Sequence, residues 1–122
     1  MNLGLYLHIP YCLHKCGYCD FNSHPENQVE SVHYVEALLK ELKFYSTTLK
    51  SYNVPTVFMG GGTPTILPPS QLKKILDTVR QGFNLTSDCE ITIEANPATI
   101  KLETLQEIHA AGYNRISIGV QS

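Results

Sequence analysis

Three of the four cysteines in this chain lie within eight residues, and their spacing is the strongest chemical signal in the sequence. Cys12, Cys16 and Cys19 follow the pattern C-x3-C-x2-C, directly after an apolar run. Three thiolates on a short loop can hold three irons of a [4Fe–4S] cube, which leaves the remaining iron open to another ligand. An open coordination position distinguishes a reactive metal site from a structural one.

The same spacing is compatible with two other kinds of site. A zinc ion bound by the three cysteines could be completed by His8, His14 or His24, since Cys3His sites are common. Two of the thiols could instead form a redox dithiol, with the third as a spare. His8 is otherwise expected to be a packed, hydrogen-bonded core histidine. Cys89 stands in a predicted loop far along the chain, and we interpret it as an incidental thiol.

Composition and charge exclude several classes of protein. The 122 residues, 43% of them hydrophobic, are enough for one globular domain or part of one. A net charge of −2 gives no electrostatic footprint for nucleic acid or an anionic membrane. No apolar run approaches the roughly 20 residues of a transmembrane helix, and the N-terminus lacks the features of a secretory signal. Crowded cysteines suit a reducing compartment, so we expect a cytoplasmic protein, or one of an organelle matrix if a targeting segment is missing.

Hydrophobic periodicity predicts strands and helices in strict alternation. The predicted strands span 3–9, 54–59, 90–94 and 115–120. The first predicted helix spans about 29–49, the second starts at Pro68-Pro69-Ser70 with Gly82 near its end, and the third carries Leu102, Leu105 and Ile108 and stops at Gly112. This order, with connections long enough for right-handed crossovers, predicts an α/β fold with a parallel sheet. Three helices would leave part of such a sheet uncovered, so we expect residues 1–122 to be the N-terminal portion of a larger barrel, with the rest of the barrel and a C-terminal domain absent. The stripe expected to be buried on the first helix is Val32, Val35, Leu38, Leu39, Leu42 and Tyr45.

Unusual residues follow the predicted strands where the strands end. The cysteine loop follows the first strand, the run Gly60-Gly61-Gly62-Thr63 follows the second, Glu94 closes the third, and Gln121 follows the fourth. In a βα barrel these carboxyl ends form one rim, where active sites lie. Glycines let a backbone approach a ligand closely, although this run is neither a dinucleotide fingerprint nor a P-loop. Glu94 could form a salt bridge or accept hydrogen bonds from ribose hydroxyls, and Gln121 could bind a ligand or a neighbouring backbone.

Together these motifs resemble the radical S-adenosylmethionine (SAM) superfamily, and within it the oxygen-independent coproporphyrinogen III oxidase-like family. The resemblance rests on Tyr6-Leu7-His8-Ile9-Pro10-Tyr11-Cys12 with Cys16 and Cys19, Gly61-Gly62-Thr63-Pro64, Glu94-Ala95-Asn96-Pro97 and Arg115 to Ser122. It implies a partial TIM-type barrel and a [4Fe–4S] cluster on Cys12, Cys16 and Cys19. The open iron would chelate the amino and carboxylate groups of SAM, and an electron donor to the cluster would generate a 5′-deoxyadenosyl radical. The implied SAM contacts are Tyr6 and Tyr18 near the cluster and adenine, Gly61, Gly62 and Thr63 at the methionine end, Glu94 at the ribose, and Gln121.

One position distinguishes two branches of this family. Members that oxidise coproporphyrinogen resemble C-x3-C-x2-C-x-C, whereas Phe21 occupies the position of the last cysteine here. The run from Cys19 to His24, Cys-Asp-Phe-Asn-Ser-His, resembles the haem chaperone branch. This similarity implies haem as bound cargo and a haemoprotein as recipient, with the cluster and SAM retained and no histidine assigned to haem. Two alternatives stay open, namely the oxidase itself and a non-enzymatic zinc-binding module.

Overall fold

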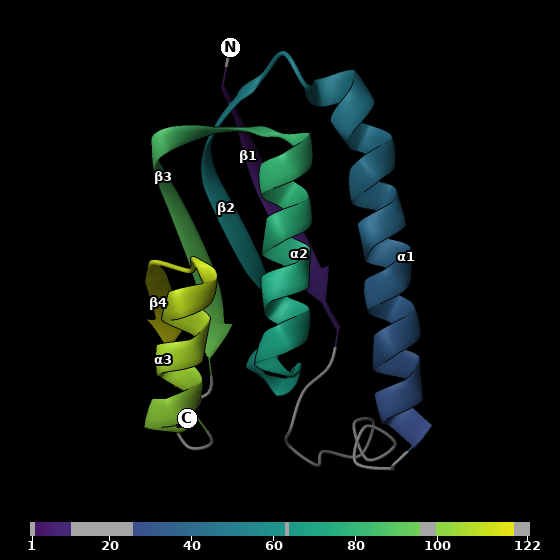
Figure 1. Cartoon of the computed structure of the whole chain (residues 1–122), viewed down its shortest axis with the longest axis vertical. Helices are drawn as coiled ribbons and strands as arrows, with labels where there is room; N and C mark the ends of the chain where they lie inside the picture. Colours follow the sequence, from purple (N-terminus) through teal and green to yellow (C-terminus); the bar gives the residue numbers. More distant parts are fainter. Residues whose placement is uncertain (1, 11–25, 63, 96–99, 119–122) are drawn as a thin grey trace.

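A parallel four-stranded sheet organises the chain (Figure 1). The computed structural model describes residues 2–10, 26–62, 64–95 and 100–118, without the side chains of 26–31 and 66. The strands follow one another in the order β1-β2-β3-β4, and each pairs in parallel with the next. The α/β fold is therefore confirmed. The elements are β1 (Asn2–Ile9), α1 (Glu26–Leu49), β2 (Asn53–Gly61), the short 3-10 helix η2 (Pro64–Ile66), α2 (Pro69–Gly82), β3 (Asn84–Ala95), α3 (Leu102–Ala111) and β4 (Arg115–Ile118).

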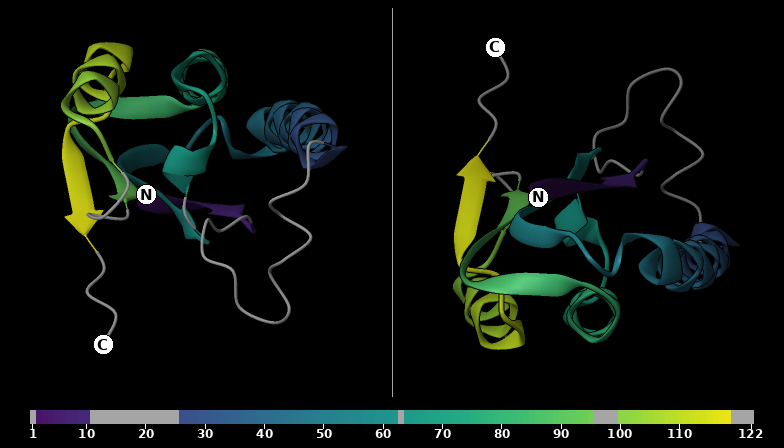
Figure 2. Two further views of the ribbon diagram at one scale, coloured as in Figure 1. Left: turned by 90° about the horizontal axis from the view of Figure 1, so that it is seen from below. Right: turned by 90° about the horizontal axis from the view of Figure 1, so that it is seen from above.

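The described α-helices all lie on one face of the sheet (Figures 1 and 2). Alternate residues of each strand point to that face because side chains alternate along a strand. On β1 the predicted alternation is confirmed: Leu7 and Ile9 are buried, whereas Tyr6 and His8 are exposed. The main core forms between this sheet face and the helices. Its largest fully buried side chains are Ile9, Met59, Leu67, Leu72, Ile75, Leu76, Ile93 and Ile108, with Val35, Val54, Val57 and Val79.

The structure corrects two sequence predictions about the elements. The strand predicted over 90–94 begins six residues earlier, at Asn84. Asn84 and Leu85 pair with the start of β2, and the side-chain Nδ2 of Asn84 donates to the side-chain Oδ1 of Asn53 at 2.7 Å. Cys89 therefore lies buried inside β3 rather than in a loop, and burial raises the pKa of its thiol.

The second correction concerns the expected stripe on α1. Val35, Leu39 and Leu42 are buried, but Val32 and Tyr45 are exposed. Only the middle of the stripe meets the core, because α1 lies beyond the β1 edge of the sheet (Figure 2). The stripe on α2, by contrast, is buried as predicted at Leu72, Ile75, Leu76 and Val79.

The turn between α3 and β4 is tied to the body of the domain by its own side chains. Gly112 ends α3 with a φ of 122°, a left-handed conformation that favours glycine. Tyr113 is buried and donates its hydroxyl hydrogen to the Leu72 carbonyl at 2.9 Å, and burial raises its pKa. The Asn114 side chain accepts from Ile91 N–H at 2.8 Å and donates to the Cys89 carbonyl at 2.9 Å. These bonds fix the start of β4 beside β3.

Candidate functional site

The carboxyl ends of the described strands meet at one rim of the sheet, as the alternation of elements predicts (Figure 1). In register, His8 of β1 lies beside Gly60 of β2, and Glu94 of β3 lies beside Ser117 of β4. The Gly61 N–H donates to Oε1 of Glu94 at 2.9 Å, although 33 residues separate them. The Gly62 N–H donates to the carbonyl of Ile9 at 2.7 Å. The glycine run is thus bonded to the strands on both sides of it.

Two glycines leave space for neighbouring side chains at the rim, Gly60 for the Glu94 carboxylate and Gly61 for the His8 ring. A Cβ atom on Gly60 would overlap Oε1 of Glu94 and would lie 2.7 Å from Cε1 of Phe58. A Cβ atom on Gly61 would lie 2.6 Å from Nδ1 of His8, and the φ of 111° at Gly61 is itself a glycine conformation. Only hydrogen atoms fit at these two positions, so the backbone of β2 and the carboxylate can share this part of the rim.

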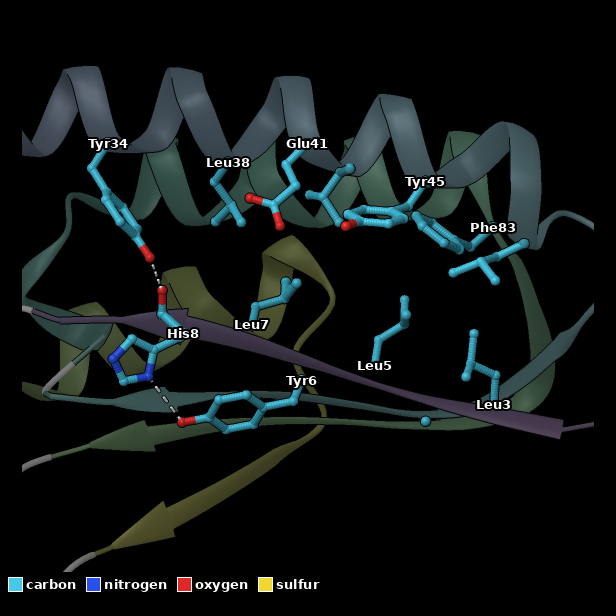
Figure 3. Close-up of a pocket in the computed structure, with 13 residues that line it drawn as sticks. Leu3, Leu5, Tyr6, Leu7, His8, Tyr34, Leu38, Glu41, Tyr45 and Phe83 are labelled. Atoms are coloured by element: carbon cyan, nitrogen blue, oxygen red, sulfur yellow. Dashed lines mark hydrogen bonds between the residues drawn. The ribbon is translucent and has the colours of Figure 1, made fainter.

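Aromatic side chains extend the site along the face that the helices leave open. Tyr6 and Phe58 are stacked, with ring centroids 5.9 Å apart and planes inclined by 16°. The Tyr6 hydroxyl lies 3.3 Å from Nδ1 of His8, within hydrogen-bonding distance. Figure 3 shows Tyr6 and His8 on the side of β1 that faces away from α1. His8 is exposed, so the expectation of a packed core histidine was wrong about its burial.

A hollow lies along the outer edge of β1, between this strand and α1 (Figure 3). Its volume is about 420 Å³, and most of its lining is apolar. At one end Tyr34 of α1 donates its hydroxyl hydrogen to the carbonyl oxygen of His8. The hollow is separate from the contact between Gly61 and Glu94 at the rim. Its main apolar lining residues are Leu3, Leu5, Leu7, Leu38, Leu42, Leu49 and Phe83.

The structure brings together four of the residues predicted to bind the cofactor. Tyr6, Gly61, Gly62 and Glu94 belong to the rim or to the open face beside it. Sequence reasoning did not single out Phe58 or the separate role of Gly60; the alternation of β2 could have placed Phe58 on the face of Tyr6. In residues 2–10, 26–62, 64–95 and 100–118, no three histidine, cysteine or acidic side chains gather as a metal site. The predicted ligands Cys12, Cys16 and Cys19, and the predicted contacts Tyr18, Thr63 and Gln121, lie outside the described residues, as do His14, Phe21 and His24.

The groups at the rim suit a polar ligand that carries a diol, which can donate to a carboxylate, and a flat ring. The only hydrogen bond to Glu94 from the described part of the chain reaches Oε1, so Oε2 can accept from a hydroxyl. The glycines expose backbone, and Tyr6 offers a ring next to them. Ribose and adenine have this chemistry, so the residues present fit SAM.

No described helix is long and apolar enough to cross a membrane.

A parallel βα sheet whose carboxyl rim carries a glycine run and a carboxylate is the architecture expected of a radical SAM protein, and comparison with known sequences agrees. Residues 6–122 match the Radical SAM superfamily, and the chain belongs to that superfamily. It is 46% identical over 121 residues to the haem chaperone HemW of Escherichia coli K12, and 44% identical over 122 residues to HemW of Mycobacterium tuberculosis. The chain aligns over 98% of its length, but it spans only about a third of these relatives (32% and 31%).

A solved structure gives the same picture of the fold. Coproporphyrinogen III oxidase (HemN) from Escherichia coli, described as a radical SAM enzyme, superimposes with a TM-score of 0.85 at 36% identity. The superposition covers 98% of this chain and 28% of that one. Both the predicted superfamily and the predicted coproporphyrinogen oxidase-like relationship are therefore confirmed.

Proposed function

We propose that this chain is the N-terminal portion of the radical SAM core of a haem chaperone, which binds haem and delivers it to a haemoprotein. The observation that supports the radical SAM part is the Gly60-Gly61-Glu94 arrangement, where a carboxylate is held against glycine backbone with one oxygen available. Two observations support the chaperone branch. Identity to curated haem chaperones reaches 46%, and Phe21 stands where the oxidase pattern has a cysteine.

In this proposal each group of residues has a separate task. Cys12, Cys16 and Cys19 hold a [4Fe–4S] cluster, which together with SAM supplies one-electron chemistry at the rim. The SAM contacts are Glu94 to the ribose, the backbone of Gly61, Gly62 and Thr63 to the methionine end, Tyr6 and Tyr18 near the adenine, and Gln121.

The described residues mainly position the groups that would bind SAM. The Gly61 N–H orients Glu94, so the carboxylate reaches the rim already aimed and loses little freedom when a ligand binds. The Gly62 N–H holds the glycine run against the end of β1, which is the strand that leads into the cysteine loop. The open face beside the rim is where the rest of a barrel would exclude water from the bound cofactor.

The proposal is tested on the full-length protein, reconstituted without oxygen. We expect about four irons and four sulfides per chain, haem binding, and no decarboxylation of coproporphyrinogen. Glu94→Gln should keep the iron but bind SAM about tenfold more weakly, because the amide still accepts from Gly61 but offers no second charged oxygen to the ribose. A metal content of about one zinc per chain, without labile sulfide, would contradict the proposed [4Fe–4S] cluster.

The oxidase is the second candidate, because the solved oxidase superimposes on nearly the whole chain. Turnover of coproporphyrinogen by the reconstituted protein would favour it over the chaperone. A Phe21→Cys variant gives a further comparison, since it restores the cysteine pattern of the oxidase in an otherwise unchanged chain.

A further inference from the structure

Phe58 of β2 lies between two groups of the candidate SAM site that come from different strands. Strand register places Phe58 beside Tyr6 of β1, and Gly60 follows two residues later, where β2 reaches the rim. Because side chains alternate along a strand, Phe58 and Gly60 face the same side of the sheet, which no described helix covers (Figure 2). One ring can therefore contact both the aromatic and the acidic part of the site.

The first contact of Phe58 fixes the plane of the Tyr6 ring. Tyr6 is exposed, and its hydroxyl lies 3.3 Å from Nδ1 of His8. A hydrogen bond at the hydroxyl cannot set the plane of the ring, because the hydroxyl lies on the axis about which the ring rotates, and this rotation is a soft one. Phe58 is half-buried and is stacked on Tyr6 with planes inclined by only 16°. The stacked ring supplies the restraint that the hydrogen bond leaves out.

The second contact of Phe58 is with the carboxylate of Glu94, over Gly60. A Cβ atom on Gly60 would overlap Oε1 of Glu94 and would lie 2.7 Å from Cε1 of Phe58, so the carboxylate oxygen and the ring edge lie over the same glycine. The edge of an aromatic ring carries partial positive charge, which favours a carboxylate oxygen beside it. The Gly61 N–H holds the same oxygen at 2.9 Å. The ring edge and the amide together limit how far the carboxylate can swing.

We propose that Phe58 is a positioning residue of the SAM site, which acts on the ligand through Tyr6 and Glu94. This inference rests on the proposed function and adds to it a residue that sets specificity. Tyr6 and Glu94 come from the strands on either side of β2, so the ring between them sets the distance from the Tyr6 ring to the carboxylate. A nucleoside, with its base and its ribose diol at a fixed separation, is the chemical class that such a spacing selects.

The test is equilibrium dialysis of SAM against the full-length protein, reconstituted without oxygen. Phe58→Leu keeps an apolar side chain but removes the ring, and it should weaken SAM binding about fivefold. Phe58→Tyr keeps the ring and should stay within about twofold of the wild type. At saturating SAM, the electron paramagnetic resonance spectrum of the reduced cluster should be the same in Phe58→Leu as in the wild type, because the methionine end of the ligand has other contacts.

Val57→Ala is the matched control for general damage to the fold. Val57 precedes Phe58 on β2, but it is buried on the side of the helices. Its truncation should lower the thermal stability at least as much as Phe58→Leu does, since it leaves a cavity in the core. We expect SAM affinity in Val57→Ala to stay within about twofold of the wild type.

A variant with both Tyr6→Leu and Glu94→Gln tests whether Phe58 acts through these two side chains. In that background, Phe58→Leu should change the remaining SAM affinity by less than about twofold, because the groups that it positions are already lost. A further fivefold loss there would overturn the inference. Wild-type SAM affinity in Phe58→Leu, or an equal loss in Val57→Ala, would also overturn it and would leave the proposed function standing. A full-length wild type that binds no SAM would overturn both.

Discussion

Replacement of Gly60 by alanine tests the geometry of the candidate SAM site with a single methyl group. Gly60 has no positive φ, so alanine suits its backbone and the substitution changes only the space available. The new methyl group would overlap Oε1 of Glu94 and would lie 3.1 Å from Cδ of Glu94 and 2.7 Å from Cε1 of Phe58. Because Gly60 belongs to a paired central strand, the Glu94 side chain must move rather than the backbone.

The size of the effect follows from the bond that is lost. Displacement of the carboxylate breaks the 2.9 Å hydrogen bond from Gly61 N–H, and hydrogen bonds to charged groups contribute about 1.5–3 kcal/mol. If Glu94 then meets the ribose only after reorienting, SAM affinity should fall about 10- to 100-fold. The crowding itself should lower the free energy of unfolding by about 1–3 kcal/mol.

Equilibrium dialysis of SAM against the reconstituted full-length protein measures the first quantity, and thermal unfolding measures the second. Gly4→Ala is the matched control: it adds the same methyl group to the same open face, where it would lie 3.0 Å from a hydroxyl of Thr56 that can rotate away. We expect its SAM affinity to stay within about twofold of the wild type. A Gly60→Ala/Glu94→Asp double variant should lose less affinity than the sum of the single changes, because the shorter carboxylate leaves room for the methyl group. Wild-type affinity in Gly60→Ala, or strict additivity in the double variant, would refute the reasoning.

Three further predictions concern the body of the domain. Burial raises the pKa of Tyr113 above its ordinary 10.0, so above pH 10 the unfolded chain loses the Tyr113 proton before the folded chain does. The free energy of unfolding should therefore fall as the pH rises further. Tyr113→Phe should reduce this fall, measured by denaturant unfolding at a series of alkaline pH values. Asn114→Ala removes the bonds to Ile91 N–H and the Cys89 carbonyl and should cost about 2 kcal/mol in the same assay, whereas a loss below about 0.5 kcal/mol would contradict the role of Asn114. Cys89→Ala should keep the full iron content of the reconstituted protein, since Cys89 lies inside β3, away from the rim; loss of iron would make this thiol a ligand.

Much of the candidate site could be predicted because its signals are local. The alternation on β1 placed Tyr6 and His8 opposite the leucines, and the parallel order brought Gly61 and Glu94 to one rim. The early start of β3 was missed because its first five residues are polar apart from Leu85. They extend the strand only by pairing with the start of β2, which is a contact distant in sequence.

By itself the sequence determined the order of elements, the cysteine spacing and the family, because periodicity and motifs are written along the chain. Only the tertiary structure decided which of those residues touch. Gly60, which the sequence marked only as part of a glycine run, lies against Glu94, and Phe58, an ordinary strand residue, is stacked on Tyr6. Sheet register sets these contacts, and a change of one residue in register would turn each side chain to the opposite face.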